Sequence, residues 1–199
     1  MNTPRPIILA SGSAIRRQLL ANAGVDVTVV PADVDERPIQ MGYTGSNPAG
    51  IAADLARLKA EAVSRAHPAA LVIGADQVLA HNQVLFAKPA GLAQARQHLT
   101  WLRGQTHELH SAVAIALEGA VVWRTIERAR LTMRDFSDAF LDAYLAHAGE
   151  RICHCVGAYE YEGPGLQLFE RIEGDYFTIL GLPLMPLLTE LRAQGAIPG

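Results

Sequence analysis

Several features that would assign this chain of 199 residues to a familiar class are absent or scarce. Its two cysteines, Cys153 and Cys155, are separated by a single residue and cannot supply a disulfide framework. This scarcity of cysteine favours a reducing compartment. No run approaches the roughly 20 apolar residues of a membrane span, and the N-terminus lacks the pattern of a signal peptide. The net charge of −3 gives no electrostatic basis for binding a nucleic-acid polymer. We therefore expect a cytoplasmic protein that binds neither a membrane nor a nucleic acid.

Sequence motifs of the common nucleotide and metal sites are also missing. The chain contains neither the phosphate loop G-x-x-x-x-G-K-[ST] nor the dinucleotide fingerprint G-x-G-x-x-G. Residues 107–110, H-E-L-H, are one residue short of the zinc motif H-E-x-x-H and fit a strand better. The tract Cys153-His154-Cys155 lacks a second pair of ligands, so reduced cysteines are favoured over a metal site.

The apolar residues present follow helical and strand periods in turn. Half of the chain is apolar and about a fifth is charged, as in globular proteins. Alternating strands and helices, followed by two long strands with a period of two, predict an α/β fold with a mixed sheet that is partly antiparallel. We expect strands at residues 7–10, 27–30, 71–73, 77–79, 84–86, 110–117 and 121–134, and helices at 18–23, 48–65, 92–102, 138–148 and 184–193. We also expect residues 74–76 to close the strand that begins at 71, and residues 169–180 to form two strands around a turn at 173–175.

The stretch 9–17, L-A-S-G-S-A-I-R-R, joins a strand to a helix. The first N–H groups of a helix are unpaired and carry partial positive charge, and Gly12 lets a ligand approach the backbone closely. With Ser11, Ser13 and Arg16 beside it, this turn suits a polyphosphate. The alternative is that Ser13 caps the helix and the arginines lie at the surface.

Other charged residues fall where elements are expected to end. Glu36 lies in a loop, Asp76 follows a buried strand, Lys88 ends a hairpin, and Lys59 lies beside the apolar face of its helix. Ligands of α/β sheets collect at the carboxyl ends of strands, and Mg²⁺ takes one or two carboxylates together with substrate phosphates. If these groups converge, they form a metal and phosphate site; if not, each is a surface charge or a strand cap. A row of arginines at alternate positions, Arg124 to Arg134, fits an exposed strand face better than a nucleic-acid interface.

Seven motifs occur in the order of the Maf family of septum-formation-inhibitor-like nucleotide pyrophosphatases, and the chain resembles that family. The resemblance covers essentially all of residues 1–199. It implies a single domain with two lobes around one cleft. The motifs are L-A-S-G-S-A-I-R-R at 9–17, D-V-D-E at 33–36, L-K-A at 58–60, G-A-D-Q-V at 74–78, K-P at 88–89, G-A-Y-E-Y-E-G at 157–163 and I-L-G-L-P-L at 179–184.

The resemblance implies hydrolysis of a nucleoside triphosphate to the monophosphate and pyrophosphate with Mg²⁺ or a similar divalent metal, as a house-cleaning activity on nucleotide pools. It implies an elongated α/β fold with a central cleft, similar to the inosine-triphosphate pyrophosphatases. Carried over by position, Ser11, Ser13 and Arg16 hold phosphates, and Lys59 and Lys88 neutralise the triphosphate. Glu36 and Asp76 handle metal and water.

Two branches of the family differ at positions that this sequence contains. Ile15, Gln77 and Glu162 favour the branch that acts on 7-methyl-GTP, with Gln77 and Glu162 on the substrate; a carboxylate pairs well with the N1–H and N2 amino group of a guanine. Ala14 departs from the family pattern, and Gly157-Ala158-Tyr159 follows the branch that acts on dTTP and UTP, which is the alternative. A non-catalytic regulator of septum formation is a further alternative. A homodimer is left open, because the sequence does not determine the oligomeric state.

Overall fold

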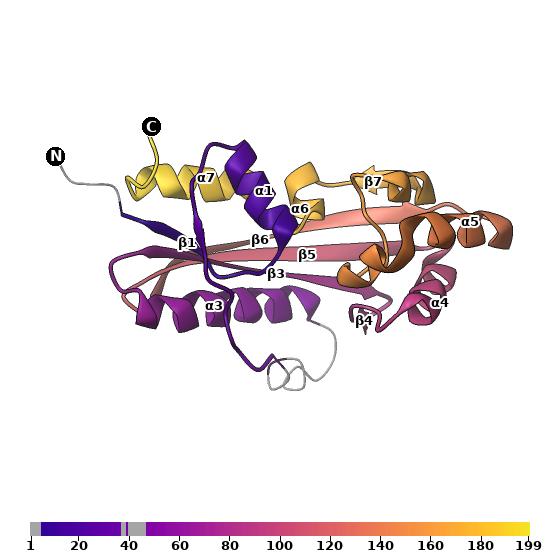
Figure 1. Ribbon diagram of the computed structural model, residues 1–199, viewed down its shortest axis with the longest axis horizontal. Coiled ribbons are helices and arrows are strands. Elements are labelled where there is room, and N and C mark those ends of the chain that lie inside the picture. Colours follow the sequence, from indigo (N-terminus) through magenta and orange to yellow (C-terminus); the bar gives the residue numbers. More distant parts are fainter. Residues whose placement is uncertain (1–4, 37–38, 40–46) are drawn as a thin grey trace.

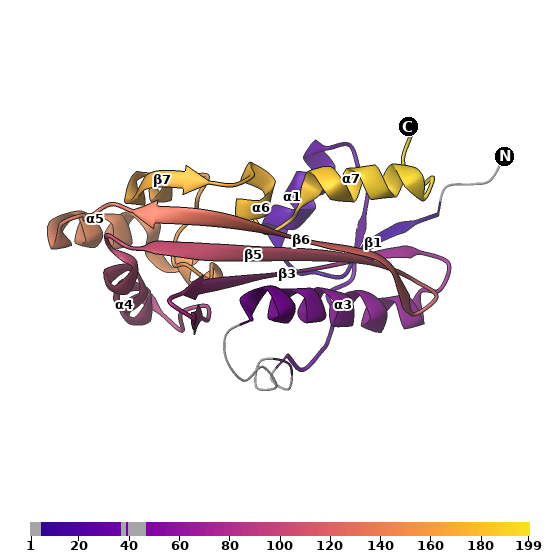
Figure 2. The ribbon, with the colours of Figure 1, turned by 180° about the vertical axis from the view of Figure 1, so that it is seen from behind.

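The structure, a computed structural model that describes residues 5–36, 39 and 47–199, is elongated and built on a mixed sheet (Figure 1). Within the described residues the sheet has seven strands in the order β2-β1-β3-β5-β6-β7, and β4 pairs with β3. Helix α3 lies on one side of this sheet, and α1, α6 and α7 lie on the other (Figures 1 and 2). The strands are β1 Ile7–Leu9, β2 Thr28–Val29, β3 Leu71–His81, β4 Val84–Phe86, β5 Thr106–Leu117, β6 Ala120–Met133 and β7 Phe169–Glu173. The helices are α1 Ala14–Asn22, α3 Pro48–Ala66, α4 Leu92–Leu102, α5 Asp138–Ala148, α6 Tyr176–Ile179 and α7 Leu184–Ala193, with the 3₁₀ helices η1 Gly149–His154 and η2 Pro164–Leu168.

The predicted mixed α/β architecture is confirmed. β1 runs parallel to both β2 and β3, whereas β3, β5, β6 and β7 pair antiparallel to one another. Helices α4, α5 and α7 lie where the periodicity predicted them. The 19-residue α3 begins as expected, because the Asn47 side chain accepts a hydrogen bond from the Gly50 N–H and Pro48 opens the first turn. The division into two lobes stays a prediction.

Strand β3 is much longer than expected. The prediction that residues 74–76 close it is wrong, since the strand continues through them to His81. Gly74 serves close packing rather than a turn: a Cβ built there would lie 2.2 Å from the Ala56 carbonyl oxygen and 2.5 Å from the Ala60 nitrogen. The missing side chain lets α3 lie directly against β3. Asp76 is therefore placed in the middle of a strand, not at its end.

One edge of β3 is left uncovered at its centre. β5 pairs with β3 from Val72 to Ala80 along the other edge. On the open edge, β1 pairs only with residues 71–73 and β4 only with residues 79–81, because β1 ends at Leu9. Among the described residues, no strand pairs with residues 74–78 on that side. This uncovered stretch exposes strand backbone to a ligand or to side chains from neighbouring elements.

Two tight turns join neighbouring antiparallel strands. Asn82 and Gln83 both have positive φ between β3 and β4, and Glu118 and Gly119 do so between β5 and β6, which matches the right-handed twist of a hairpin. In β5, His107 is fully buried and shares a hydrogen bond of 2.7 Å with the Tyr159 hydroxyl. The H-E-L-H tract is thus a strand, as expected.

The arginine row of β6 lies on the exposed side of that strand. Arg128 and Arg130 both reach the Glu108 carboxylate, at 3.1 and 3.7 Å, and Arg130 also lies 3.8 Å from Glu173. Exposed ion pairs of this kind contribute little to stability. The predicted exposed strand face is confirmed.

The segment after β7 differs from its prediction. Residues 176–179 form one helical turn, α6, rather than a strand. Asp175 caps it, since its carboxylate accepts a hydrogen bond from the Thr178 N–H at 2.9 Å. A side-chain cap satisfies the first backbone donors locally, so the segment does not need a neighbouring strand.

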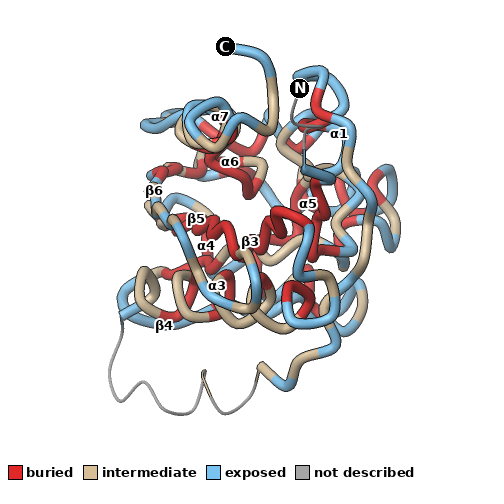
Figure 3. Tube along the Cα trace, turned by 90° about the vertical axis from the view of Figure 1, so that its left-hand side faces the viewer, coloured by how far each residue is buried: buried red, intermediate tan, exposed pale blue. Residues whose placement is uncertain are grey.

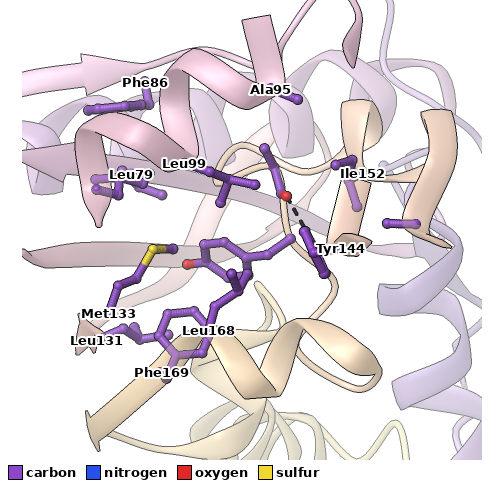
Figure 4. Close-up of a cluster of buried hydrophobic side chains, with 14 of the residues drawn as sticks. Leu79, Phe86, Ala95, Leu99, Leu131, Met133, Tyr144, Ile152, Leu168 and Phe169 are labelled. Atoms are coloured by element: carbon purple, nitrogen blue, oxygen red, sulfur yellow. Dashed lines mark hydrogen bonds between the residues drawn. The ribbon is translucent and has the colours of Figure 1, made fainter. Parts of the chain in front are cut away.

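Buried apolar side chains form two large clusters, one toward each end of the sheet, and buried residues lie along the central strands (Figure 3). In one cluster Leu79, Leu99 and Phe169 pack together from β3, α4 and β7 (Figure 4). In the other, α1 and α7 pack on β1 and β3. Among the described residues, no helix is long and apolar enough to cross a membrane.

Candidate active site

A lysine of α3 joins two carboxylates next to the uncovered edge of β3. Lys59 Nζ lies 2.6 Å from Asp76 Oδ1 and 2.7 Å from Glu36 Oε1. Lys59 directly precedes Ala60, which touches Gly74, so the close packing of α3 on β3 brings the ammonium group to Asp76. The structure thus brings together three predicted site residues that are far apart in sequence.

Asp76 is the most buried carboxylate of this group, with 9% of the residue exposed. Burial raises the pKa of its carboxyl above the ordinary value, while Lys59 and Arg16 oppose that rise. Glu36, by contrast, keeps 39% of its side chain exposed. A buried carboxylate between two cations is suited to hold a proton, a water or a metal ion.

Arg16 approaches the same edge from the opposite side of the sheet. Its Nη1 donates to the Ala75 carbonyl at 2.9 Å and to Ser11 Oγ at 3.0 Å, and its Nε donates to the Gly181 carbonyl at 2.8 Å. Ala75 O is free to accept because β1 ends before it. Burial lowers the pKa of Arg16, and the nearby Asp76 and Glu36 carboxylates oppose this change. The guanidinium is thereby fixed near Asp76.

The serines lie between β1 and α1, as predicted, but α1 begins at Ala14 and not at the predicted residue 18. Ser13 is the N-cap, and its Oγ accepts from the Arg16 N–H at 3.4 Å; Ser11 Oγ lies 3.4 Å from the Ser13 nitrogen. The capping alternative is therefore correct for Ser13. It does not compete with anion binding, because a cap occupies one of the free N–H groups and leaves others at that helix end. Arg17 is exposed and stands apart from these contacts.

The side-chain amide of Gln77 is hydrogen-bonded within the protein. Adjacent strand residues point to opposite faces, so Gln77 faces α6 while Asp76 faces α3. Its Nε2 donates to Ser111 Oγ at 3.0 Å and to the carbonyl oxygens of Thr178 and Ile179 at 3.2 and 3.0 Å. The predicted contact of Gln77 with a substrate stays a prediction, but its amide N–H groups already have partners.

Two further predicted residues lie apart from the Lys59 cluster. Lys88 is exposed, two residues beyond β4, which borders the uncovered edge on the side away from β1. Its charge acts on Cys155, where burial raises the thiol pKa and Lys88 opposes the rise. Glu162 is exposed and accepts a hydrogen bond from the Tyr176 hydroxyl at 2.5 Å. Cys153 and Cys155 are free thiols.

Sequence reasoning missed the polar residues that hold α6 to the sheet. Ser111 and Thr178 are fully buried, and Ser111 Oγ donates to the Thr178 carbonyl at 2.7 Å. Thr178 Oγ1 donates to Glu127 at 2.7 Å. The only usable signal was Asp175 placed three residues before Thr178, which is the spacing of a helix cap.

These features define an α/β protein with a candidate site at the uncovered edge of β3. A helix N-terminus with an arginine lies on one side of the sheet, and a lysine with two carboxylates lies on the other. The chain belongs to the Maf family, since the family model described as "Maf-like protein" matches residues 6–194.

Close relatives share nearly the full length of the chain. A nucleoside triphosphate pyrophosphatase of Bradyrhizobium diazoefficiens is 55% identical over 192 residues, which cover 96% of this chain and 95% of the relative. A 7-methyl-GTP pyrophosphatase of Mesorhizobium japonicum is 51% identical over 195 residues, 97% of this chain and 98% of the relative. One of Rhizobium johnstonii with the same name is 50% identical over 199 residues, covering 99% of this chain and 100% of the relative.

Proposed function

We propose that this protein is a nucleoside triphosphate pyrophosphatase, which hydrolyses its substrate to the monophosphate and pyrophosphate. The observation that carries the proposal is the Lys59–Asp76 pair beside Arg16 at the uncovered edge of β3. Full-length relatives with pyrophosphatase names, at 50–55% identity, support it.

The reaction requires water to attack the α-phosphorus while the bond from that phosphorus to the bridging oxygen breaks. Asp76 orients the attacking water and accepts its proton, and Lys59 holds Asp76 in place. Arg16 and the N-terminus of α1 bind the phosphates, with Ser11 and Ser13. Lys88, across the uncovered edge, neutralises the leaving pyrophosphate.

The residues fit a divalent metal such as Mg²⁺. Carboxylate oxygens of Asp76 and Glu36 lie close enough together that both contact Lys59 Nζ. Mg²⁺ needs only one or two carboxylates when substrate phosphates complete its shell, and the described residues contain no cluster of three or more metal-ligating side chains. A metal held by Asp76 and Glu36 would supply charge neutralisation for the triphosphate.

We further propose 7-methyl-GTP as the preferred substrate. Glu162 supports this choice, because a carboxylate accepts the N1–H and N2 hydrogens of guanine, whereas uracil offers one donor flanked by two carbonyls. The competing choice, dTTP or UTP, is favoured by Gly157-Ala158-Tyr159.

A nucleotide panel with Mg²⁺ tests both levels of the proposal. We expect pyrophosphate and monophosphate to form, with kcat/KM for 7-methyl-GTP exceeding that for UTP and dTTP by about tenfold or more. A preference for UTP would overturn the substrate choice alone. Absence of turnover on every canonical and modified triphosphate would overturn the proposed activity.

A further inference from the structure

The only described contact that fixes Glu162 comes from α6. The Tyr176 hydroxyl donates to Glu162 Oε1 at 2.5 Å, the short distance typical of a hydrogen bond to a charged carboxylate. Both side chains lie at the surface, with Tyr176 43% exposed, so the bond is not a by-product of core packing. It occupies one carboxylate oxygen and leaves Oε2 for a ligand.

The Tyr176 ring is itself held by neighbours. Phe177 packs on it edge-on, with ring centroids 5.5 Å apart, and Tyr161 lies at 6.0 Å. Tyr161 directly precedes Glu162 and also contacts Phe169, which belongs to the buried cluster. Aromatic contacts of this kind restrict the ring, so the hydroxyl is presented in one direction.

α6 is in turn fixed to the strand that carries Asp76. Gln77 donates to the carbonyl oxygens of Thr178 and Ile179, and Ser111 donates to that of Thr178. Arg16 donates to the Gly181 carbonyl just beyond the helix. Figures 1 and 2 show α6 on the same side of the sheet as α1. Arg16, proposed to bind phosphate, and Tyr176, which holds Glu162, are therefore both connected to the segment formed by α6 and Gly181.

We infer that Tyr176 is a positioning residue for nucleobase selection: its hydroxyl orients the Glu162 carboxylate, and Gln77 sets the place of α6 relative to Asp76. The inference rests on the proposed function. It assigns Gln77 to holding α6 rather than to touching the substrate. Without the Tyr176 hydroxyl, Glu162 is an exposed side chain with several rotamers, and pairing with a guanine edge then requires ordering it.

A double-mutant cycle tests the role of Tyr176. For Tyr176→Phe we expect the ratio of kcat/KM for 7-methyl-GTP to kcat/KM for UTP to fall about fivefold to tenfold, through KM for 7-methyl-GTP, with kcat on UTP little changed. Glu162→Gln should lower the ratio at least as far, and the double variant should equal Glu162→Gln, because Tyr176 acts only through that carboxylate. Tyr161→Phe, which removes a hydroxyl from the neighbouring ring, is the matched control and should keep the wild-type ratio.

Two outcomes overturn the inference: an unchanged ratio in Tyr176→Phe, or effects of the two substitutions that multiply in the double variant. If the wild type hydrolyses no nucleotide, the proposed function fails instead. The ratio of Kd values for 7-methyl-GTP and UTP, measured without metal, then tests Tyr176 through the same cycle and with the same expected pattern.

Discussion

Replacement of Asp76 by asparagine is expected to lower kcat/KM for nucleotide hydrolysis by at least about 100-fold, the usual range for loss of a general base. Asparagine keeps the shape and an acceptor for Lys59 but cannot take a proton from water. The fold should persist, because a neutral amide costs less to bury than the carboxylate it replaces. The measurement is steady-state kinetics together with thermal unfolding. Asp142→Asn, at an exposed carboxylate paired with Arg96, is the matched control and should behave as wild type. Full activity in Asp76→Asn would remove Asp76 from the reaction.

The pH profile provides a second check on the same residue. Because burial raises the pKa of Asp76, and the proton acceptor must be ionised, activity should fall as the pH drops through that raised value. This fall forms the acid limb of the profile, which a divalent metal on Asp76 would move to lower pH. In Asp76→Asn the residual activity should lose this limb.

The second large effect is expected at Gly74. In Gly74→Ala the new methyl group meets α3 backbone at 2.2 and 2.5 Å, and backbone cannot give way as a flexible side chain can. We expect α3 to be displaced from β3, with a loss of about 3 kcal/mol or more in the free energy of unfolding, or failure to fold. Any folded fraction should also lose activity, because Lys59 moves with the helix.

Urea unfolding with Gly91→Ala as control measures this effect. At Gly91, the N-cap of α4, the backbone is extended and no atom lies within 4 Å of the added Cβ, so the cost should stay below about 1 kcal/mol. Equal stability of the Gly74 and Gly91 variants would contradict the role assigned to Gly74.

Local signals were sufficient for most elements. α4, α5 and α7 each show helical spacing of apolar residues, and α5 has a serine cap. The two largest errors arose where local and tertiary preferences differ. Glycine at position 74 is a residue type typical of turns, yet here it lies within a strand because α3 packs too closely on β3 for any side chain. Residues 176–179 have aromatic and β-branched side chains that suit a strand, yet the Asp175 cap makes a helical turn.

The site was predicted less completely than the fold. Lys59 and Asp76 lie on different elements, so spacing alone could not show that they meet; the family resemblance suggested both residues. Nothing in the sequence indicated that the Gln77 amide would donate hydrogen bonds to the carbonyl oxygens of Thr178 and Ile179. Such contacts depend on which strand face meets α6, and a one-residue change in register would reverse it.

Hydrolysis in water enriched in oxygen-18 tests the central claim most directly. If water attacks the α-phosphorus with Asp76 as proton acceptor, the label enters the nucleoside monophosphate, and the pyrophosphate carries none. Both products are read by mass spectrometry after a single turnover. Label in the pyrophosphate would contradict attack at the α-phosphorus, and release of orthophosphate and a diphosphate would contradict the proposed pyrophosphatase.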